Sequence, residues 1–280
     1  MGRTQAVAGL IAVVLLAGCG KSGGIVVGSK DFTEQTILGE IVAQHLERRL
    51  SVKVDRKPHL GGTLLAHKAL VAGQIDVYPE YSGTALTEVL KLPASRDVAA
   101  VEAQVRAEYR SRWNIEWMPP LGFNNTFAMV IQSGYETLSQ AAARPKGWRL
   151  GVGYEFLTRA DGLPGLLETY HLPLDGTPRS MNLGLLYQAL KQNQVDMVAG
   201  NSTDGLIAAM GLTALRDDKN YFPPYAAALV VRRAIPHLQE ALAELSGKIS
   251  TEAMRKMNYE VDGKHRPVRD VAKEFLQSGP

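Results

Sequence analysis

One segment of the chain occurs twice, 120 positions apart and without a gap. KALVAGQIDVYPEYSGTAL, which begins at Lys68, aligns with QALKQNQVDMVAGNSTDGL, which begins at Gln188. The identical pairs span a helix-like part, a strand-like part and a loop: Ala69/Ala189, Leu70/Leu190, Gln74/Gln194, Asp76/Asp196, Ser82/Ser202 and Leu86/Leu206. Because this spacing is much longer than the period of a solenoid, the repeat predicts two lobes of similar structure. Chance similarity of two helix–strand–loop units is the alternative.

The hydrophobic pattern in the first half alternates between strand and helix. Short apolar runs at 25–27, 52–55 and 75–78 predict strands, and residues 33–50 and 64–72 predict helices. Asp31 or Thr33 is the expected N-cap of the first helix. The alternation predicts an α/β fold with a mainly parallel sheet flanked by helices. Ligands of such sheets bind beyond the carboxyl ends of the strands, here at loops 28–30, 60–63 and 79–84.

The second half repeats this plan, with a strand and turn at 148–153 and a helix at 183–191. Two lobes leave a cleft between them, and such clefts commonly hold small molecules. In the register of the repeat, Tyr81 corresponds to Asn201 and Thr84 to Asp204. We expect both loops to point into the cleft.

The N-terminus predicts export. Residues 1–18 combine Arg3 with an apolar stretch that is too short to span a membrane, which is typical of a secretory signal. The stretch ends in Leu-Ala-Gly-Cys, which resembles the bacterial lipobox, and Cys19 is the only cysteine in the chain. We therefore predict a signal peptide at 1–18, lipidation of Cys19 and a tether at 19–24. An ordinary signal peptide with an unmodified cysteine is the alternative.

Charge and motifs argue against several other functions. The chain has 31 Lys and Arg against 28 Asp and Glu and no run of five or more basic residues, which disfavours binding of nucleic acid. No nucleophile elbow, P-loop or His-Glu-x-x-His motif is present, and the six histidines are dispersed. We therefore expect no catalytic residues, no metal site and no cofactor. A metal-binding solute receptor would need a cluster of His, Asp and Glu, which the sequence does not show. The effector domain of a DNA-binding regulator has the same two-lobed fold, but the predicted export argues against that function.

Aromatic residues gather in the loops that would face the cleft. They occur in VYPEYSGT, GFNNTFAM, GVGYEF and YFPPYAA. Several convergent rings favour a quaternary ammonium cation, at roughly 0.5–2 kcal/mol for each ring. For any single ring, packing in the core is the competing interpretation. Tyr81 and Tyr225 are the best candidates for the cleft, because turn-forming glycine or proline lies beside each of them.

A zwitterionic ligand would also need partners for its carboxylate. Arg159 is the leading candidate, because a guanidinium binds a carboxylate through two hydrogen bonds. Lys30 is the second, near the start of a predicted helix where anions are favoured. Thr84 would add a hydroxyl donor, although a threonine at that place can also cap the following helix. For both cations, a solvated surface position is the alternative.

Six segments together resemble a known family. They are GSKDFTEQTILGEI, GGTLLAHKALVAGQIDVYPEYSGTAL, LGFNNTFAMVI, YEFLTRADGLPGL, STDGLI and FPPYAAALVV. They are similar to the substrate-binding proteins of osmoprotectant ABC importers, which bind glycine betaine, carnitine and choline. The resemblance implies a type II periplasmic-binding-protein fold that closes on its ligand. It also implies two chain crossings between the lobes, near 126–130 and 224–230. Lobe I would then comprise 25–127 and 227–280, and lobe II 128–226.

The resemblance assigns roles to eight residues. The family's ammonium cage maps to Tyr81, Phe127, Asn201 and Tyr225. Lys30, Thr84 and Arg159 would contact the carboxylate, and Asn125 would make a further polar contact. Phe127 and Asn201 depart from the tyrosine that is usual in the cage. These departures leave glycine betaine, carnitine and choline open, together with a larger betaine such as ergothioneine or a non-betaine polar solute.

The resemblance also implies partners and location. A monomeric, lipid-anchored protein would capture its solute outside the cytoplasm, at the outer face of the cell membrane or in the periplasm. It would deliver the solute to a membrane permease driven by a separate ATPase.

Overall fold

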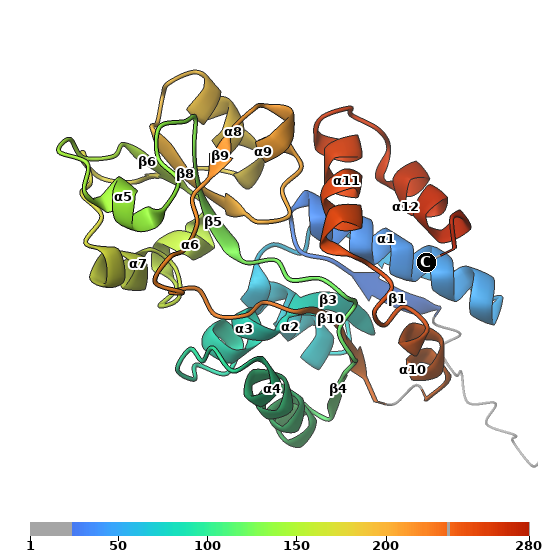
Figure 1. Ribbon diagram of the computed structural model, residues 1–280. Helices are drawn as coiled ribbons and strands as arrows, with labels where there is room; N and C mark the ends of the chain where they lie inside the picture. Colours follow the sequence, from blue (N-terminus) through green and yellow to red (C-terminus); the bar gives the residue numbers. More distant parts are fainter. Residues whose placement is uncertain (1–23, 234–235, 280) are drawn as a thin grey trace, which may run out of the picture.

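The computed structural model describes residues 24–233 and 236–279, which form two lobes, each built on a five-stranded sheet (Figure 1). The predicted signal peptide, the lipidation site at Cys19 and the tether up to residue 23 lie outside the described residues. Among the described residues, none of the helices combines the length and apolar character needed to cross a bilayer.

The sheet of lobe I has the strand order β2-β1-β3-β10-β4. Its strands are β1 (Ile25–Gly28), β2 (Val54–Lys57), β3 (Val77–Tyr81), β4 (Ile115–Trp117) and β10 (Ala227–Arg232). Strands β1, β2 and β3 are parallel, whereas β10 runs antiparallel to both β3 and β4. The helical segments of this lobe are α1 (Thr33–Leu50), α2 (Thr63–Val71), α3 (Ser82–Thr84), the π-helical turn η1 (Ala85–Val89), α4 (Val98–Trp113), α10 (Pro236–Ala243), α11 (Thr251–Asp262) and α12 (Val268–Gln277).

The sheet of lobe II has the corresponding order β7-β6-β8-β5-β9. Its strands are β5 (Phe127–Ile131), β6 (Leu150–Val152), β7 (Arg179–Ser180), β8 (Met197–Asn201) and β9 (Thr213–Ala214). Its helices are α5 (Leu138–Ala142), α6 (Tyr154–Thr158), α7 (Leu163–Tyr170), α8 (Leu183–Lys191) and α9 (Leu206–Ala209). Strand β5 is antiparallel to β8, as β10 is to β3, so the two sheets share one topology.

Helix α1 has the predicted bounds because its apolar residues recur on one face. Ile37, Leu38 and Ile41 are at most 1% exposed and pack in the core of lobe I. The predicted cap is wrong: the N-cap is Phe32, which has an extended backbone and no side-chain cap bond. The hydroxyl of Thr33 is used elsewhere, because it donates to Asp262 Oδ1 at 2.6 Å.

Strand β3 lies later in the chain than predicted, at 77–81 rather than 75–78, so residues 79–81 are not part of a loop. Proline lacks an N–H, yet Pro79 pairs with Leu229 inside this sheet. The arrangement is possible because the Leu229 carbonyl accepts from the backbone of Met118, on the opposite side of β10. The displacement brings Tyr81 to the very end of the strand.

The chain crosses between the lobes twice, and the two crossing segments pair at Asn124 and Ala226. The two serines of the repeat hold one crossing segment each. Ser82 N donates to Ala226 O at 3.0 Å, and Ser82 Oγ accepts from Ala226 N at 3.0 Å. Ser202 N donates to Thr126 O at 2.9 Å, and Ser202 Oγ accepts from Thr126 N at 3.1 Å. Phe127, the last residue of the expected first segment of lobe I, already pairs within the second sheet.

Candidate functional site

A cavity of about 430 Å³ lies between the lobes, at the ends of strands β3 and β8. Its lining includes all eight residues predicted to bind ligand: Lys30, Tyr81, Thr84, Asn125, Phe127, Arg159, Asn201 and Tyr225. These residues come from six separate stretches of the chain, so only the fold brings them together.

One wall of the cavity is aromatic. The rings of Phe127 and Tyr225 meet edge to face with centroids 5.7 Å apart, and Phe127 meets Phe156 at 4.9 Å. Tyr81 stacks with Phe32 at 6.4 Å. Phe32 and Phe156 also line the cavity. Phe156 belongs to the GVGYEF segment, whose aromatic residues are expected to face the cleft, whereas Phe32 was not predicted. Phe32 lies within the SKDFTEQ motif, which was the available signal.

The two tyrosine hydroxyls are tied to buried carboxylates. Tyr81 donates to Glu34 Oε1 at 2.7 Å, and Tyr225 donates to Asp161 Oδ2 at 2.7 Å. Burial raises the pKa of both phenols well above the ordinary value, and the neighbouring carboxylate charge raises it further. Both groups therefore stay protonated as donors, and the tyrosines offer ring surface to the cavity rather than free hydroxyls.

Glu34, in the first turn of α1, links the aromatic wall to both lobes. Besides Tyr81, it accepts from Asn125 Nδ2 at 2.8 Å, Thr203 Oγ1 at 2.5 Å and Asn258 Nδ2 at 3.1 Å. Burial raises the pKa of Glu34, whereas these hydrogen bonds lower it, and the net direction is upward. No local pattern marks Glu34 as part of the site, although it lies in the SKDFTEQ motif, because its four donors come from distant positions.

The ammonium group of Lys30 also lines the cavity, 5.3 Å from the centroid of the Tyr81 ring, and the residue is 2% exposed. Its Nζ donates to Glu80 Oε1 at 2.5 Å and to Thr63 Oγ1 at 3.0 Å. Lys30 is therefore a buried, paired cation and not a solvated surface charge.

Arg159 brings a second buried cation from lobe II. Its Nε and Nη2 donate to the two carboxylate oxygens of Asp161 at 2.8 and 2.5 Å, and Nη2 also reaches Thr84 Oγ1 at 3.2 Å. Burial alone would lower the pKa of Arg159, but hydrogen bonds to Asp161 and its charge raise it, so the guanidinium is charged. It lies 5.1 Å from the centroid of the Phe127 ring. Thr84 acts as an acceptor here and makes no helix-cap bond.

Asn201 ends strand β8 and lies opposite Phe127 in the second sheet. Its backbone N–H donates to Asp204 Oδ2 at 2.8 Å, and the same oxygen accepts from Tyr187 OH at 2.6 Å. Burial raises the pKa of Asp204 to about 6.

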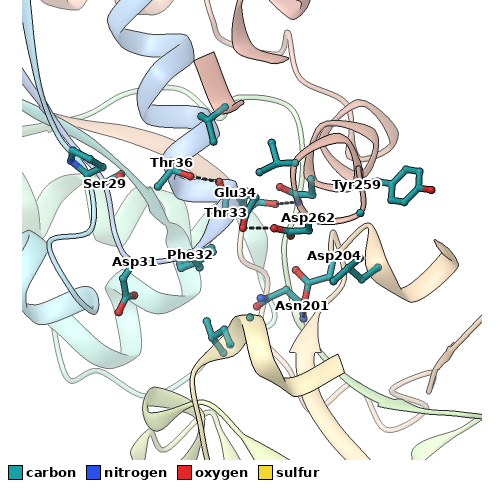
Figure 2. Close-up of a pocket in the computed structure, with 18 of the residues that line it drawn as sticks. Ser29, Asp31, Phe32, Thr33, Glu34, Thr36, Asn201, Asp204, Tyr259 and Asp262 are labelled. Atoms are coloured by element: carbon teal, nitrogen blue, oxygen red, sulfur yellow. Dashed lines mark hydrogen bonds between the residues drawn. The ribbon is translucent and has the colours of Figure 1, made fainter. Parts of the chain in front are cut away.

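Asn201 also lines a second cavity of about 990 Å³ (Figure 2). In Figure 2, Glu34 and Asp262 lie on one side of this cavity, and Asn201 and Asp204 lie on the other. Its lining is thus richer in carboxylates than the first cavity.

The site is suited to holding a small cation against aromatic faces and a polar group against Arg159 and Lys30. In residues 24–233 and 236–279, no group of three or more His, Cys, Asp and Glu is placed to hold a metal ion.

Comparisons with known proteins agree on one family. Residues 23–278 match the family model described as the substrate binding domain of ABC-type glycine betaine transport systems. A carnitine transport binding protein of Listeria monocytogenes is 34% identical over 263 residues, which cover 90% of this chain and 85% of that protein. An ergothioneine transport permease/ergothioneine binding protein of Helicobacter pylori is 32% identical over 90% of this chain, but the chain spans only 47% of its length.

A solved structure, described as a glycine betaine/carnitine/choline ABC transporter, superposes with a TM-score of 0.75 at 32% identity. The match covers 91% of this chain and 98% of that one. The predicted two-lobed periplasmic-binding-protein fold is thereby confirmed. The chain belongs to the substrate-binding domains of ABC-type glycine betaine transport systems, which is a family of solute-binding transport proteins.

Proposed function

We propose that the cavity between the lobes captures a quaternary-ammonium solute for an ABC importer. The observation that carries the proposal is the convergence of three rings, those of Tyr81, Phe127 and Tyr225, and the guanidinium of Arg159 on one cavity of about 430 Å³. Ring faces attract a cation that cannot donate hydrogen bonds, and a guanidinium attracts a carboxylate. A zwitterion such as glycine betaine or carnitine has both a quaternary ammonium group and a carboxylate, so it can make both kinds of contact.

The two departures from an all-tyrosine cage bear on which ligand the cavity accepts. Phe127 keeps a ring, whereas Asn201 offers an amide that both donates and accepts. Relatives of this chain carry the names of carnitine and ergothioneine binding proteins, and both compounds have polar groups that an amide would meet. We propose these two compounds beside glycine betaine and choline; a non-betaine polar solute is the alternative.

The wider setting belongs to the same proposal. The protein would be exported, anchored through lipidated Cys19, and would act as a monomer that delivers its solute to a permease with its own ATPase. Membrane fractionation with and without globomycin tests the anchor, with Cys19→Ser as the control. A wild-type protein that leaves the membrane fraction as readily as Cys19→Ser would contradict it.

Calorimetric titration with glycine betaine, choline, carnitine and ergothioneine tests the ligand class. We expect at least one dissociation constant in the micromolar range or tighter, which corresponds to about −8 kcal/mol. No binding by any of the four would refute the proposal.

Arg159→Ala distinguishes the contacts made to the carboxylate of the ligand from those made to its ammonium group. It should abolish measurable binding of the carboxylate ligands and weaken choline, which has no carboxylate, much less. Since the change leaves Asp161 without its partner, Arg159→Lys is the second variant, and thermal unfolding shows that each is folded. Equal losses for betaine and choline would contradict the assignment of Arg159 to the carboxylate.

A further inference from the structure

Glu155 of α6, in lobe II, reaches across the cavity to the N-terminus of α2, in lobe I. Its Oε1 accepts from Thr63 N at 2.5 Å, and its Oε2 accepts from Thr63 Oγ1 at 3.1 Å. A Cβ on Gly62 would lie 2.5 Å from Oε1, so the glycine at this position admits the carboxylate. The site thus holds an anion of the protein's own at a helix N-terminus, where anions are stabilised.

The same carboxylate lies beside the two cations of the cavity. Glu155 Oε2 is 3.6 Å from Arg159 Nη1, and Lys30 Nζ donates to the threonine hydroxyl that contacts Glu155. Glu155 itself lines the cavity. Arg159 is the group that the proposed function assigns to the carboxylate of a ligand, and the family resemblance implies the same role for Lys30. Glu155 therefore competes for that position.

The charge balance strengthens the competition. Lys30 is already paired with Glu80, and Arg159 with Asp161. Glu155 is a third carboxylate beside two cations. A ligand carboxylate would be a fourth, so it must either displace Glu155 from Thr63 or lie against it. A ligand of similar size that ends in a hydroxyl meets no such repulsion and can donate to Glu155.

We propose that Glu155 is a specificity-determining residue, which lowers affinity for carboxylate-bearing quaternary amines relative to quaternary-ammonium alcohols. The inference rests on the proposed function, because it concerns the same cavity. The proposed role differs from a purely structural one, in which Glu155 would only hold the two lobes together. Loss of a structural contact would weaken all ligands by the same factor, whereas loss of a competing anion changes the ratio between ligands.

Glu155→Gln tests this, because the amide keeps the size of the side chain and removes its charge. Calorimetry with glycine betaine and choline compares two ligands that differ mainly in a carboxylate against a hydroxymethyl group. We expect the ratio of betaine affinity to choline affinity to rise by about tenfold or more, which is about 1.4 kcal/mol. Glu168→Gln is the matched control, since this exposed carboxylate of α7 lies in the same lobe and lines neither cavity.

The outcomes are distinguishable. A raised betaine-to-choline ratio in Glu155→Gln, with an unchanged ratio in Glu168→Gln, supports the inference. An unchanged or lowered ratio in Glu155→Gln overturns it, even where both affinities fall. If Glu155→Gln fails a thermal-unfolding check, Glu155→Ala replaces it under the same criterion. If neither glycine betaine nor choline binds wild type or variant, this inference is overturned. The proposed function fails as well only if carnitine and ergothioneine also do not bind.

Discussion

The two copies of the repeated segment make matching contacts to the two segments that cross between the lobes, here called the hinge, but they carry different side chains at the cavity. Ser82 and Ser202 make the same pair of backbone bonds, each to its own crossing segment, at 2.9–3.1 Å. One position earlier, Tyr81 is 4% exposed and presents a ring braced by Glu34, whereas Asn201 is half-buried and has its backbone braced by Asp204.

This comparison shows that one loop meets two separate requirements, one set by the hinge and one set by the cavity. The hinge depends on backbone geometry and one small hydroxyl, which both copies supply. The cavity depends on the chemistry of the neighbouring side chain, which can change without disturbing the hinge. Lobe I therefore contributes a ring and a hydroxyl to the ligand cavity through Tyr81 and Thr84, and lobe II contributes an amide through Asn201. Asp204, which aligns with Thr84, lines only the second cavity.

The largest expected difference between the copies is in ligand binding. Tyr81→Ala removes a ring from the cavity wall and should weaken a quaternary-ammonium ligand by about 30-fold, because a desolvated cation–π contact is worth up to about 2 kcal/mol. Asn201→Ala should weaken it by about threefold or less. Tyr81→Phe is the control, since it keeps the ring and loses only the bond to Glu34. Calorimetry measures all three, and equal losses in the two alanine variants would break the distinction.

The hinge should respond alike in both copies. Ser82→Ala and Ser202→Ala each remove one acceptor for a backbone N–H and should lower the free energy of unfolding by about 1–2 kcal/mol. Ser82 should lie at the upper end, because it is fully buried. Urea unfolding measures both, with Ser111→Ala on the exposed face of α4 as the control. A loss confined to one copy would argue against a hinge of matched halves.

A third difference between the copies is a pH dependence at Asp204 of lobe II, which aligns with the non-titrating Thr84 of lobe I. The pKa of Asp204 is raised to about 6, whereas an unfolded aspartate titrates near 3.9, so the folded protein holds more protons in between. The contribution of Asp204 to stability therefore falls as pH rises from about 4 to about 6. Asp204→Asn should flatten the stability profile over that window relative to wild type, in urea unfolding at several pH values. Parallel profiles would show that Asp204 does not titrate there.

Much of the fold was predictable from local pattern. Helices α1 and α8 have the predicted bounds, because their apolar residues recur at the helical period. Strand β3 was displaced in the prediction because Pro79 is typical of a turn, and only the pairing with Leu229 accommodates it. Local pattern also did not show whether the histidines on the predicted helices are exposed. His45 and His67 both lie on such helices, and both are buried in the structure.

The sequence by itself determined two lobes of one topology and the residue types that line the cavity between them. Periodicity and repetition are local or regular features of a chain, so they can be recognised without coordinates. The tertiary structure alone decided which charged and polar side chains form pairs. Glu34 gathers donors up to 224 positions away, and Glu155 reaches Thr63 across 92 positions. Such pairings follow from the packing of distant segments, and no local pattern encodes that packing.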